Sequence, residues 1–296
     1  MIDQPQISIV TVNYHQPTVT CELLKSIALL SYPNLEVIVV DNGQKTDNTT
    51  IYKSYYPYVT VVTSEANLGF AGGNNLGIEK ASGEFIFLLN NDTEISDGTI
   101  ESMLKAFTDD TVGAVNPIIR YYDEPDRVQF SGFTAIDPVT GRNDKLTDVP
   151  DDYRESVYFH GAAVMIRKSA IDKMGPMPER YFLYYEELDW SVRLSESGYK
   201  TVVDPYSIIL HKESVSTGKM SPLKTYYQSR NRLFFMFKNN HFLSFCLFAS
   251  YYLFLVTPVK LFKLLIAQNW ALLVAHAKSI PDFFRLVIHP NRVIQF

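Results

Sequence analysis

Two groups of polar side chains are candidates for chemistry. The first is Asn90, Asn91 and Asp92, which directly follow the apolar run Phe85–Leu89. Five apolar residues suit a buried strand, and ligands of open α/β sheets bind beyond the carboxyl ends of strands. Oxygen-bearing side chains at such an end indicate a site for a hard cation and the group that it holds. The alternative is an Asn-rich turn in which Asp92 caps the next helix.

The second group is acidic and begins a predicted helix. Glu186, Glu187 and Asp189 follow the aromatic and apolar stretch 182–185. Desolvation beside such side chains raises a carboxyl pKa toward the range of a general base. The three acids would also suit the positive end of a helix dipole without any catalytic role. His211 ends a later apolar run and is a candidate metal ligand, although a lone histidine is more often a packing or surface residue.

A Gly- and Asn-rich stretch, 67–75, precedes a short predicted helix, 75–81. We expect a loop there that approaches a ligand, because glycine permits close backbone contact and a helix N-terminus favours anions. The pattern is neither GxGxxG nor a P-loop. An ordinary surface loop is the alternative.

Strand-like and helix-like stretches alternate, which predicts βαβ units and a mostly parallel sheet in an α/β fold. The polar, aromatic stretch 121–158 is typical of a long loop or a hairpin insertion. The expected strands are 7–12, 35–40, 59–63, 85–89, 112–117, 159–166, 202–204 and 208–210, and the expected helices are 18–30, 75–81, 101–107, 169–174 and one from 186.

Charge is distributed unevenly along the 296 residues, whose net charge is −5. From Lys224 onward there are nine Lys or Arg residues and one acid, a balance of +8. This basic charge accompanies an aromatic, apolar tail, so we expect anionic lipid as the partner and no nucleic acid. Cys21 and Cys246 form no metal or disulfide pattern, which indicates a reducing compartment.

The tail contains an uncharged run of 18 residues, 242–259. That length is at the lower limit for spanning a bilayer of about 30 Å. Basic residues among the apolar ones beyond it favour amphipathic helices that lie in the membrane interface, monotopic or re-entrant, over a true span. An interface between copies of the chain is the alternative. We therefore expect two regions, 1–223 and 224–296.

Six ordered blocks resemble the family-two glycosyltransferases with the GT-A fold, and among them the bacterial rhamnosyltransferase-like group. They are ISIVTVNYH, VVDNG, EANLGFAGGNNLGI, FLLNNDTE, YYEELDW with SGYK, and IILHKESVSTG, and YYQSRNRLFF continues the match. The resemblance covers about residues 5–235. It implies a Rossmann-like mixed sheet flanked by helices, and inverting transfer from a nucleotide-sugar donor.

The resemblance also implies roles for individual residues. Asp41 would bind the pyrimidine base, and Asp92 is the one acid left in the segment that corresponds to the family's Asp-x-Asp metal motif. His211 would complete the shell of a Mg²⁺ or Mn²⁺ ion. Glu187 takes the position of the family's catalytic Asp, with Glu186 and Asp189 as supporting or alternative bases. The remaining expected contacts to donor or metal are Val12, Asn13, Asn67, Gly72, Gly73, Asn75, Asn90 and Asn91.

By the same resemblance, the donor is a dTDP- or UDP-linked sugar, with dTDP-rhamnose as the first expectation. The acceptor is a lipid-linked glycan on the cytoplasmic face of a bacterial inner membrane, for a surface polysaccharide. A nucleotidyltransferase would need a basic triphosphate clamp, and Ser64–Ile78 contains no Lys or Arg. A nucleotide- or glycan-binding scaffold subunit remains the alternative, because only Asp92 is charged in its motif.

Overall fold

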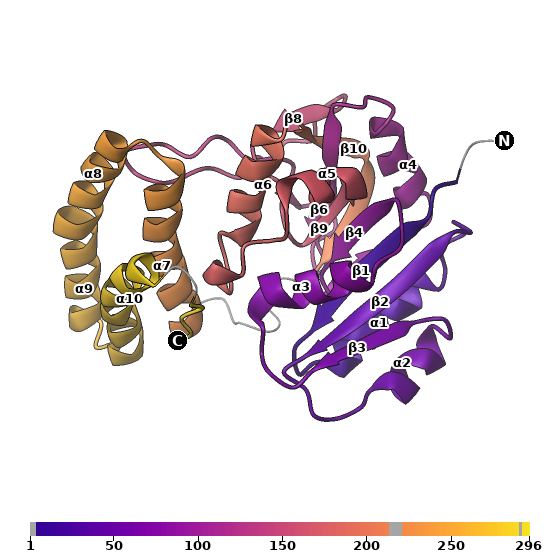
Figure 1. Cartoon of the computed structure of the whole chain (residues 1–296), viewed down its shortest axis with the longest axis horizontal. Helices are drawn as coiled ribbons and strands as arrows, with labels where there is room; N and C mark the ends of the chain where they lie inside the picture. Colours follow the sequence, from indigo (N-terminus) through magenta and orange to yellow (C-terminus); the bar gives the residue numbers. More distant parts are fainter. Residues whose placement is uncertain (1–3, 213–220, 290–291) are drawn as a thin grey trace.

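The computed structural model describes residues 4–212, 221–289 and 292–296. A ten-stranded sheet carries helices on both faces, and the C-terminal helices pack together beside it (Figure 1). The strands are β1 Ile7–Asn13, β2 Leu35–Asn42, β3 Thr60–Ser64, β4 Phe85–Leu89, β5 Thr93–Ile95, β6 Val112–Tyr121, β7 Val128–Phe130, β8 Arg154–Ser156, β9 Ala163–Arg167 and β10 Lys200–His211. The helices are α1 Pro17–Ile27, α2 Thr49–Tyr55, α3 Gly69–Lys80, α4 Thr99–Ala106, α5 Lys168–Met174, α6 Glu186–Glu196, α7 Pro222–Asn239, α8 Phe242–Tyr251, α9 Thr257–Ile266 and α10 Trp270–Ile288, with a 3₁₀ turn at Glu179–Tyr181 and a π turn at Tyr252–Val256.

The sheet is mixed, with its main path in the order β3-β2-β1-β4-β9-β6-β10-β5. β1 to β4 form the parallel half that the alternating pattern predicted, and β9 lies antiparallel between β4 and β6. Since β1, β2 and β4 run in the same direction, their carboxyl ends meet at one edge. That edge brings Asn13, Asp41 and Asn90 to the same end of the sheet.

Alternation along the strands divides the core into two layers. Ile7, Ile9 and Phe87 face the layer that contains α1 and α4. Val10 and Leu88 face the opposite layer, which contains α3, α5 and α6. Both faces of the central strands are therefore covered, and the chemistry has to lie at the strand ends.

The Gly-rich stretch is helical, so the prediction of a loop there was wrong. α3 begins at Gly69 and not near residue 75. Its glycines lie against the sheet: a Cβ at Gly73 would be 2.9 Å from Val12 Cγ1, and one at Gly77 would be 2.3 Å from Val10 Cγ1. Close contact between helix and strand thus accounts for these glycines. The sequence analysis also missed α2 and β5, and it divided β10 at an irregularity between Asp204 and Ile208.

The insertion 121–158 contributes β7 and β8, and between these two strands it extends to the C-terminal helices (Figure 1). Gly141 lies beside Phe248, and Arg232 of α7 donates a hydrogen bond to the carbonyl of Thr140. The helix formed by α8, the π turn and α9 covers Phe242–Ile266. By length and composition this 25-residue helix could cross a membrane, and it is mostly exposed.

Candidate active site

Asp41 is fully buried at the end of β2 and is surrounded by donors. Asn13 Nδ2 and the Tyr52 hydroxyl donate to its Oδ1 at 2.8 and 2.7 Å. Asn48 Nδ2 donates to Oδ2 at 2.9 Å. Burial and the neighbouring carboxylate raise the pKa of Tyr52, which therefore stays a neutral donor. Asp41 thus orients Asn13, and the expected contact of Asp41 with the pyrimidine base of a nucleotide stays a prediction.

Asn42 forms hydrogen bonds between β2 and residues 67–69, where contacts with the nucleotide-sugar donor are expected. Its Nδ2 donates to Gly69 O at 3.0 Å and to Asn67 Oδ1 at 3.2 Å, and its Oδ1 accepts from the Leu68 N–H at 2.8 Å. These bonds bring the start of α3 against the carboxyl ends of β1 and β2. The structure thereby gathers Asn13, Asp41 and Asn67, with Val12 at the end of β1 against Gly73.

The expected donor contacts farther along α3 serve its packing in this structure. The Asn75 side chain donates to Met177 O at 2.9 Å and to Glu179 Oε1 at 2.8 Å, and it accepts from the Met177 N–H at 2.9 Å. Gly72 and Gly73 are buried within the helix. These three residues connect α3 to its neighbours, so they do not form the ligand-approaching loop that we predicted.

Asp92 and His211 meet although 118 residues separate them in the chain, because β10 pairs with β5. Their Oδ1 and Nε2 atoms are 3.2 Å apart, and both side chains are buried. His211 Nδ1 lies 2.8 Å from Gln129 Oε1. In the tautomer that carries a proton on Nδ1 alone, this oxygen accepts that proton and Nε2 presents a lone pair to the carboxylate.

Two acceptors facing each other at this distance fit a shared cation. A carboxylate oxygen and an imidazole nitrogen suit Mn²⁺ as ligands, and the carboxylate suits Mg²⁺. Residues 4–212, 221–289 and 292–296 contain no group of three or more His, Cys, Asp or Glu side chains arranged for a metal. Asp92 and His211 alone would supply only part of a metal's ligands, and oxygens of a bound ligand would have to complete the set.

The two asparagines before Asp92 differ in position. Asn91 is buried and its Nδ2 donates to Thr20 Oγ1 of α1 at 3.1 Å, so its side chain faces a helix. Asn90 is half-buried, its N–H donates to Ala162 O at 2.9 Å, and its carbonyl accepts from Thr93 Oγ1 at 2.6 Å. The segment is thus both a tight turn and the strand end beside the Asp92–His211 pair.

The three acids of α6 have different environments. Asp189 is fully buried, and Lys238 Nζ of α7 binds both of its oxygens at 2.6 Å, which occupies it as a link between the helices. Burial, together with the charge of Glu187, raises the pKa of Glu186 well above its ordinary range. Burial raises the pKa of Glu187 from 4.5 to about 7, against hydrogen bonds from nearby backbone N–H groups.

Glu187 is consequently the strongest candidate for a general base. Its side chain is half-buried, while that of Glu186 is 2% exposed. The Oε2 atoms of Glu186 and Glu187 are both buried without a hydrogen-bond partner among the described residues, so exposure of the rest of the side chain distinguishes the two. A carboxyl with a pKa near neutrality and a free oxygen is suited to accept a proton from an alcohol.

The short segment 160–162 lies between Glu187 and the turn that begins at Asn90. A Cβ at Gly161 would be 3.6 Å from Glu187 Cβ, and Ala162 O accepts the bond from Asn90. The His160 ring is centred 6.5 Å from that of His211, and burial lowers its pKa. Sequence reasoning missed His160, along with Asn48, Tyr52 and Gln129, because their contacts follow no helix or strand periodicity.

Backbone strain precedes the base. Phe182, Tyr184 and Tyr185 have φ values of 67°, 67° and 78°. Side chains of this size rarely adopt such angles, and each costs about 1–3 kcal/mol. Strain of this kind persists only where surrounding contacts enforce it, and it lies here directly before Glu186.

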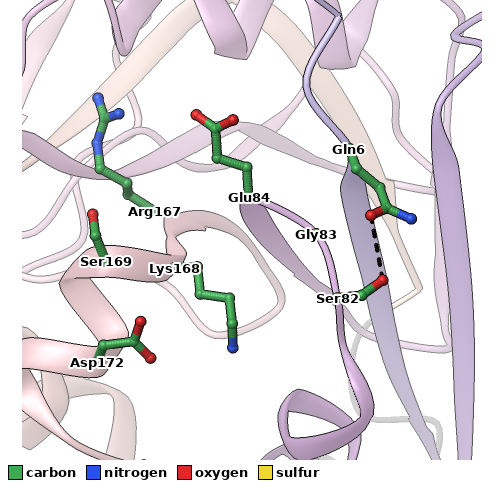
Figure 2. Close-up of a pocket in the computed structure, with 8 residues that line it drawn as sticks. All are labelled: Gln6, Ser82, Gly83, Glu84, Arg167, Lys168, Ser169 and Asp172. Carbon is green, nitrogen blue, oxygen red and sulfur yellow. Dashed lines mark hydrogen bonds between the residues drawn. The ribbon is translucent and has the colours of Figure 1, made fainter.

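A cavity of about 590 Å³ is at the opposite edge of the sheet. It lies where β4 begins and β9 ends, and charged side chains of both signs surround it (Figure 2). Arg167 is already engaged there, since it packs over Phe85 and Phe107 and donates to Phe107 O at 2.9 Å. The lining residues are Gln6, Ser82, Gly83, Glu84, Arg167, Lys168, Ser169 and Asp172.

Comparison with known proteins agrees with this arrangement. The family model described as Glycosyl transferase family 2 matches residues 8–175. The N-acetylglucosaminyl-diphospho-decaprenol L-rhamnosyltransferase of Mycobacterium tuberculosis is 26% identical over 237 residues, which are 71% of this chain and 77% of that protein.

Two solved structures show the same fold at low identity. GalNAc-T7 with UDP, GalNAc and Mn²⁺ has a TM-score of 0.62 at 14% identity, over 74% of this chain and 46% of that one. S. aureus TarS 1-349 with UDP-GlcNAc has a TM-score of 0.60 at 19% identity, over 94% of this chain and 80% of that one. The predicted GT-A fold, a mixed sheet flanked by helices, is confirmed. Residues 213–218 of the last matched sequence block lie outside the described residues.

Proposed function

Because the chain belongs to glycosyl transferase family 2, we propose that it is an inverting, metal-dependent enzyme that moves a sugar from a nucleoside-diphosphate donor to a hydroxyl group. The observation that carries this proposal is Glu187, a carboxyl with a pKa of about 7. It lies beside the segment 160–162, whose other contacts lead to Asn90 and the Asp92–His211 pair.

The chemistry assigned to Glu187 is proton removal. Its carboxylate accepts the proton of the acceptor hydroxyl as that oxygen bonds to the anomeric carbon. The bond from this carbon to the diphosphate oxygen breaks on the opposite face, and the nucleoside diphosphate leaves with the electron pair. A single displacement of this kind inverts the anomeric centre, and Glu187 ends protonated.

Asp92 and His211 would hold a Mg²⁺ or Mn²⁺ ion, with Asn90 beside them. A divalent cation supplies neutralisation of the charge on a diphosphate leaving group. Asp41, Asn13 and Asn67, at the neighbouring strand ends, would bind the nucleoside. This division of the polar residues into a diphosphate group and a base group favours transfer.

For substrates, we propose a donor such as dTDP-rhamnose or a UDP-sugar, and a lipid-linked glycan as acceptor. The name of the mycobacterial relative supports this choice, since it describes rhamnosyl transfer to a diphospho-decaprenol glycan. The C-terminal region would hold the enzyme at the cytoplasmic face of a bacterial inner membrane. Apolar side chains exposed on α8–α10 support that location: Phe242, Leu243, Leu247, Phe254, Leu255, Phe262, Ile266, Trp270 and Ile288.

A donor screen by calorimetry tests the site. UDP, dTDP and GDP are titrated with and without Mn²⁺ into the wild type and Asp92→Ala. We expect UDP or dTDP to bind only with Mn²⁺, and Asp92→Ala to lose that binding. If no nucleotide binds under any condition, residues 90–92 are a turn. If a nucleotide binds but its sugar is never transferred, the chain acts as a scaffold subunit.

A further inference from the structure

The polypeptide that leads into Glu187 has a backbone path that its own residues do not favour. Phe182 and Tyr184 have φ values of 67°, and Tyr185, which caps α6, has 78°. None of these is glycine, so the segment needs external contacts to keep its shape. A hydrogen bond from the Phe70 N–H to Phe182 O, at 2.7 Å, supplies one of them.

One buried side chain of α7 supplies most of the remaining contacts. Asn231 is fully buried, and its Nδ2 donates to the carbonyls of Tyr181, Leu183 and Tyr184 at 3.0, 2.8 and 2.8 Å. A primary amide has two N–H groups, so three acceptors require one of them to be shared. A single side chain therefore binds three of the five carbonyls of 181–185, and the N–H groups of Phe70 and Asp189 bind the other two.

Arg230 fixes the orientation of that amide. Its Nε donates to Asn231 Oδ1 at 2.8 Å, so the nitrogen of the amide is directed toward the segment. Arg230 Nη2 also donates to Tyr181 O at 2.7 Å, and the guanidinium packs over the ring of Tyr227. The arginine is fully buried, and its five donors suit several backbone carbonyls at once.

The position of Glu187 depends on this segment. Its Oε2 has no hydrogen-bond partner among the described residues, so no other side chain holds that oxygen. Glu187 is the second residue of α6, and Tyr185, within the stretch 181–185, is the N-cap of that helix. The path of this stretch therefore determines where the first turn of α6 places Glu187.

We propose that Asn231 is a positioning residue for transfer: its amide, oriented by Arg230, holds the 181–185 backbone in the left-handed conformations that direct Glu187 toward the acceptor hydroxyl. The inference rests on the proposed function, in which Glu187 is the base. It adds a role for the Arg-Asn pair of the YYQSRNRLFF segment, which the sequence analysis could match but not explain.

Asn231→Asp is the most informative variant. It keeps the shape of the side chain but replaces both N–H donors by an oxygen that faces three carbonyls. Asn239→Ala is the matched control, because Asn239 lies on the same helix and donates only to Phe235 O within it, at 3.1 Å. Asn231→Ala tests whether the added charge of the aspartate, and not the loss of donors, causes the effect.

The assay measures rhamnose transfer from dTDP-rhamnose to a short-chain GlcNAc-diphospho-prenol, together with the Kd for dTDP and Mn²⁺ on the same samples. We expect kcat of both Asn231 variants to fall by about 100-fold, the loss typical of a group misplaced by about 1 Å. The Kd and the fraction of molecules that bind dTDP should stay at wild-type values. The apparent pKa in the pH profile of kcat/KM should move away from about 7, and Asn239→Ala should change neither quantity.

Two results would overturn the inference. One is a kcat within twofold of wild type with an unmoved pH profile. The other is a loss of activity that equals the loss of dTDP-binding molecules, because Asn231 would then only keep the protein folded. Glu187→Gln separates this failure from that of the proposed function: if Glu187→Gln keeps its activity, the assignment of the base is wrong whatever Asn231 does.

Discussion

Replacing Glu187 by glutamine should stop transfer and stabilise the folded protein at the same time. Loss of a general base lowers kcat by about 100- to 10,000-fold. Glutamine has nearly the same size and stays neutral, so the fold no longer has to hold a charged carboxylate in this partly desolvated position. The two effects have opposite signs, which makes the prediction specific to a buried base.

The magnitude follows from the pKa of Glu187, which rises from 4.5 to about 7 on folding. The folded state then binds the proton more tightly than the unfolded chain, so this carboxyl destabilises the fold increasingly as pH rises from 4.5 to 7. Above pH 7 the loss reaches about 3 kcal/mol. Glu187→Gln should therefore gain up to about 3 kcal/mol over wild type between pH 4.5 and pH 8. Wild-type kcat/KM should rise with pH through about 7.

Urea unfolding at pH 4.5 and pH 8 measures the stability difference, and transfer from dTDP-rhamnose measures the activity. Glu196→Gln is the control, because Glu196 lies on the same helix and is exposed. If the difference in unfolding free energy between Glu187→Gln and wild type is the same at pH 8 as at pH 4.5, the pKa of Glu187 is not raised by folding. Activity of Glu187→Gln within tenfold of wild type would refute its role as base.

Asp92→Ala should weaken Mn²⁺ binding by more than about tenfold, measured by calorimetry with UDP present; unchanged binding would contradict the cation site. Asp41→Asn replaces one acceptor oxygen by an NH₂ group, which then faces Asn48 Nδ2 or, with the amide turned over, the two donors on Oδ1. The change should cost about 1–3 kcal/mol in urea unfolding and weaken UDP binding. Gly77→Ala would put a Cβ 2.3 Å from a methyl group of β1 and should cost about 1–3 kcal/mol; no loss of stability would show that α3 can move away. Phe254→Asp should reduce sedimentation with phosphatidylglycerol vesicles, whereas Tyr58→Asp, at an equally exposed site on the sheet domain, should not.

Local signals were sufficient for much of the fold. The strand Phe85–Leu89 was predicted with its observed bounds, because the asparagines that follow the five apolar residues mark where the strand ends. The prediction for the Gly-rich stretch was wrong, because glycine has a low helix propensity and only contact with β1 makes α3 extend back to Gly69. The division into residues 1–223 and 224–296 stays a prediction, although α7 begins at Pro222.

The sequence by itself determined the alternation of strands and helices and the residue types at the strand ends, since these depend on periodicity within short stretches. It also identified the family, because each matching block is a short contiguous stretch and the blocks follow one another in order. Tertiary structure alone decided which of the three acids is available: Lys238 occupies Asp189, and burial separates Glu186 from Glu187. The contact of His211 with Asp92 and the hydrogen bonds of Asn231 to 181–185 likewise form only on folding. Contacts between residues so far apart in the chain leave no periodic pattern in the sequence.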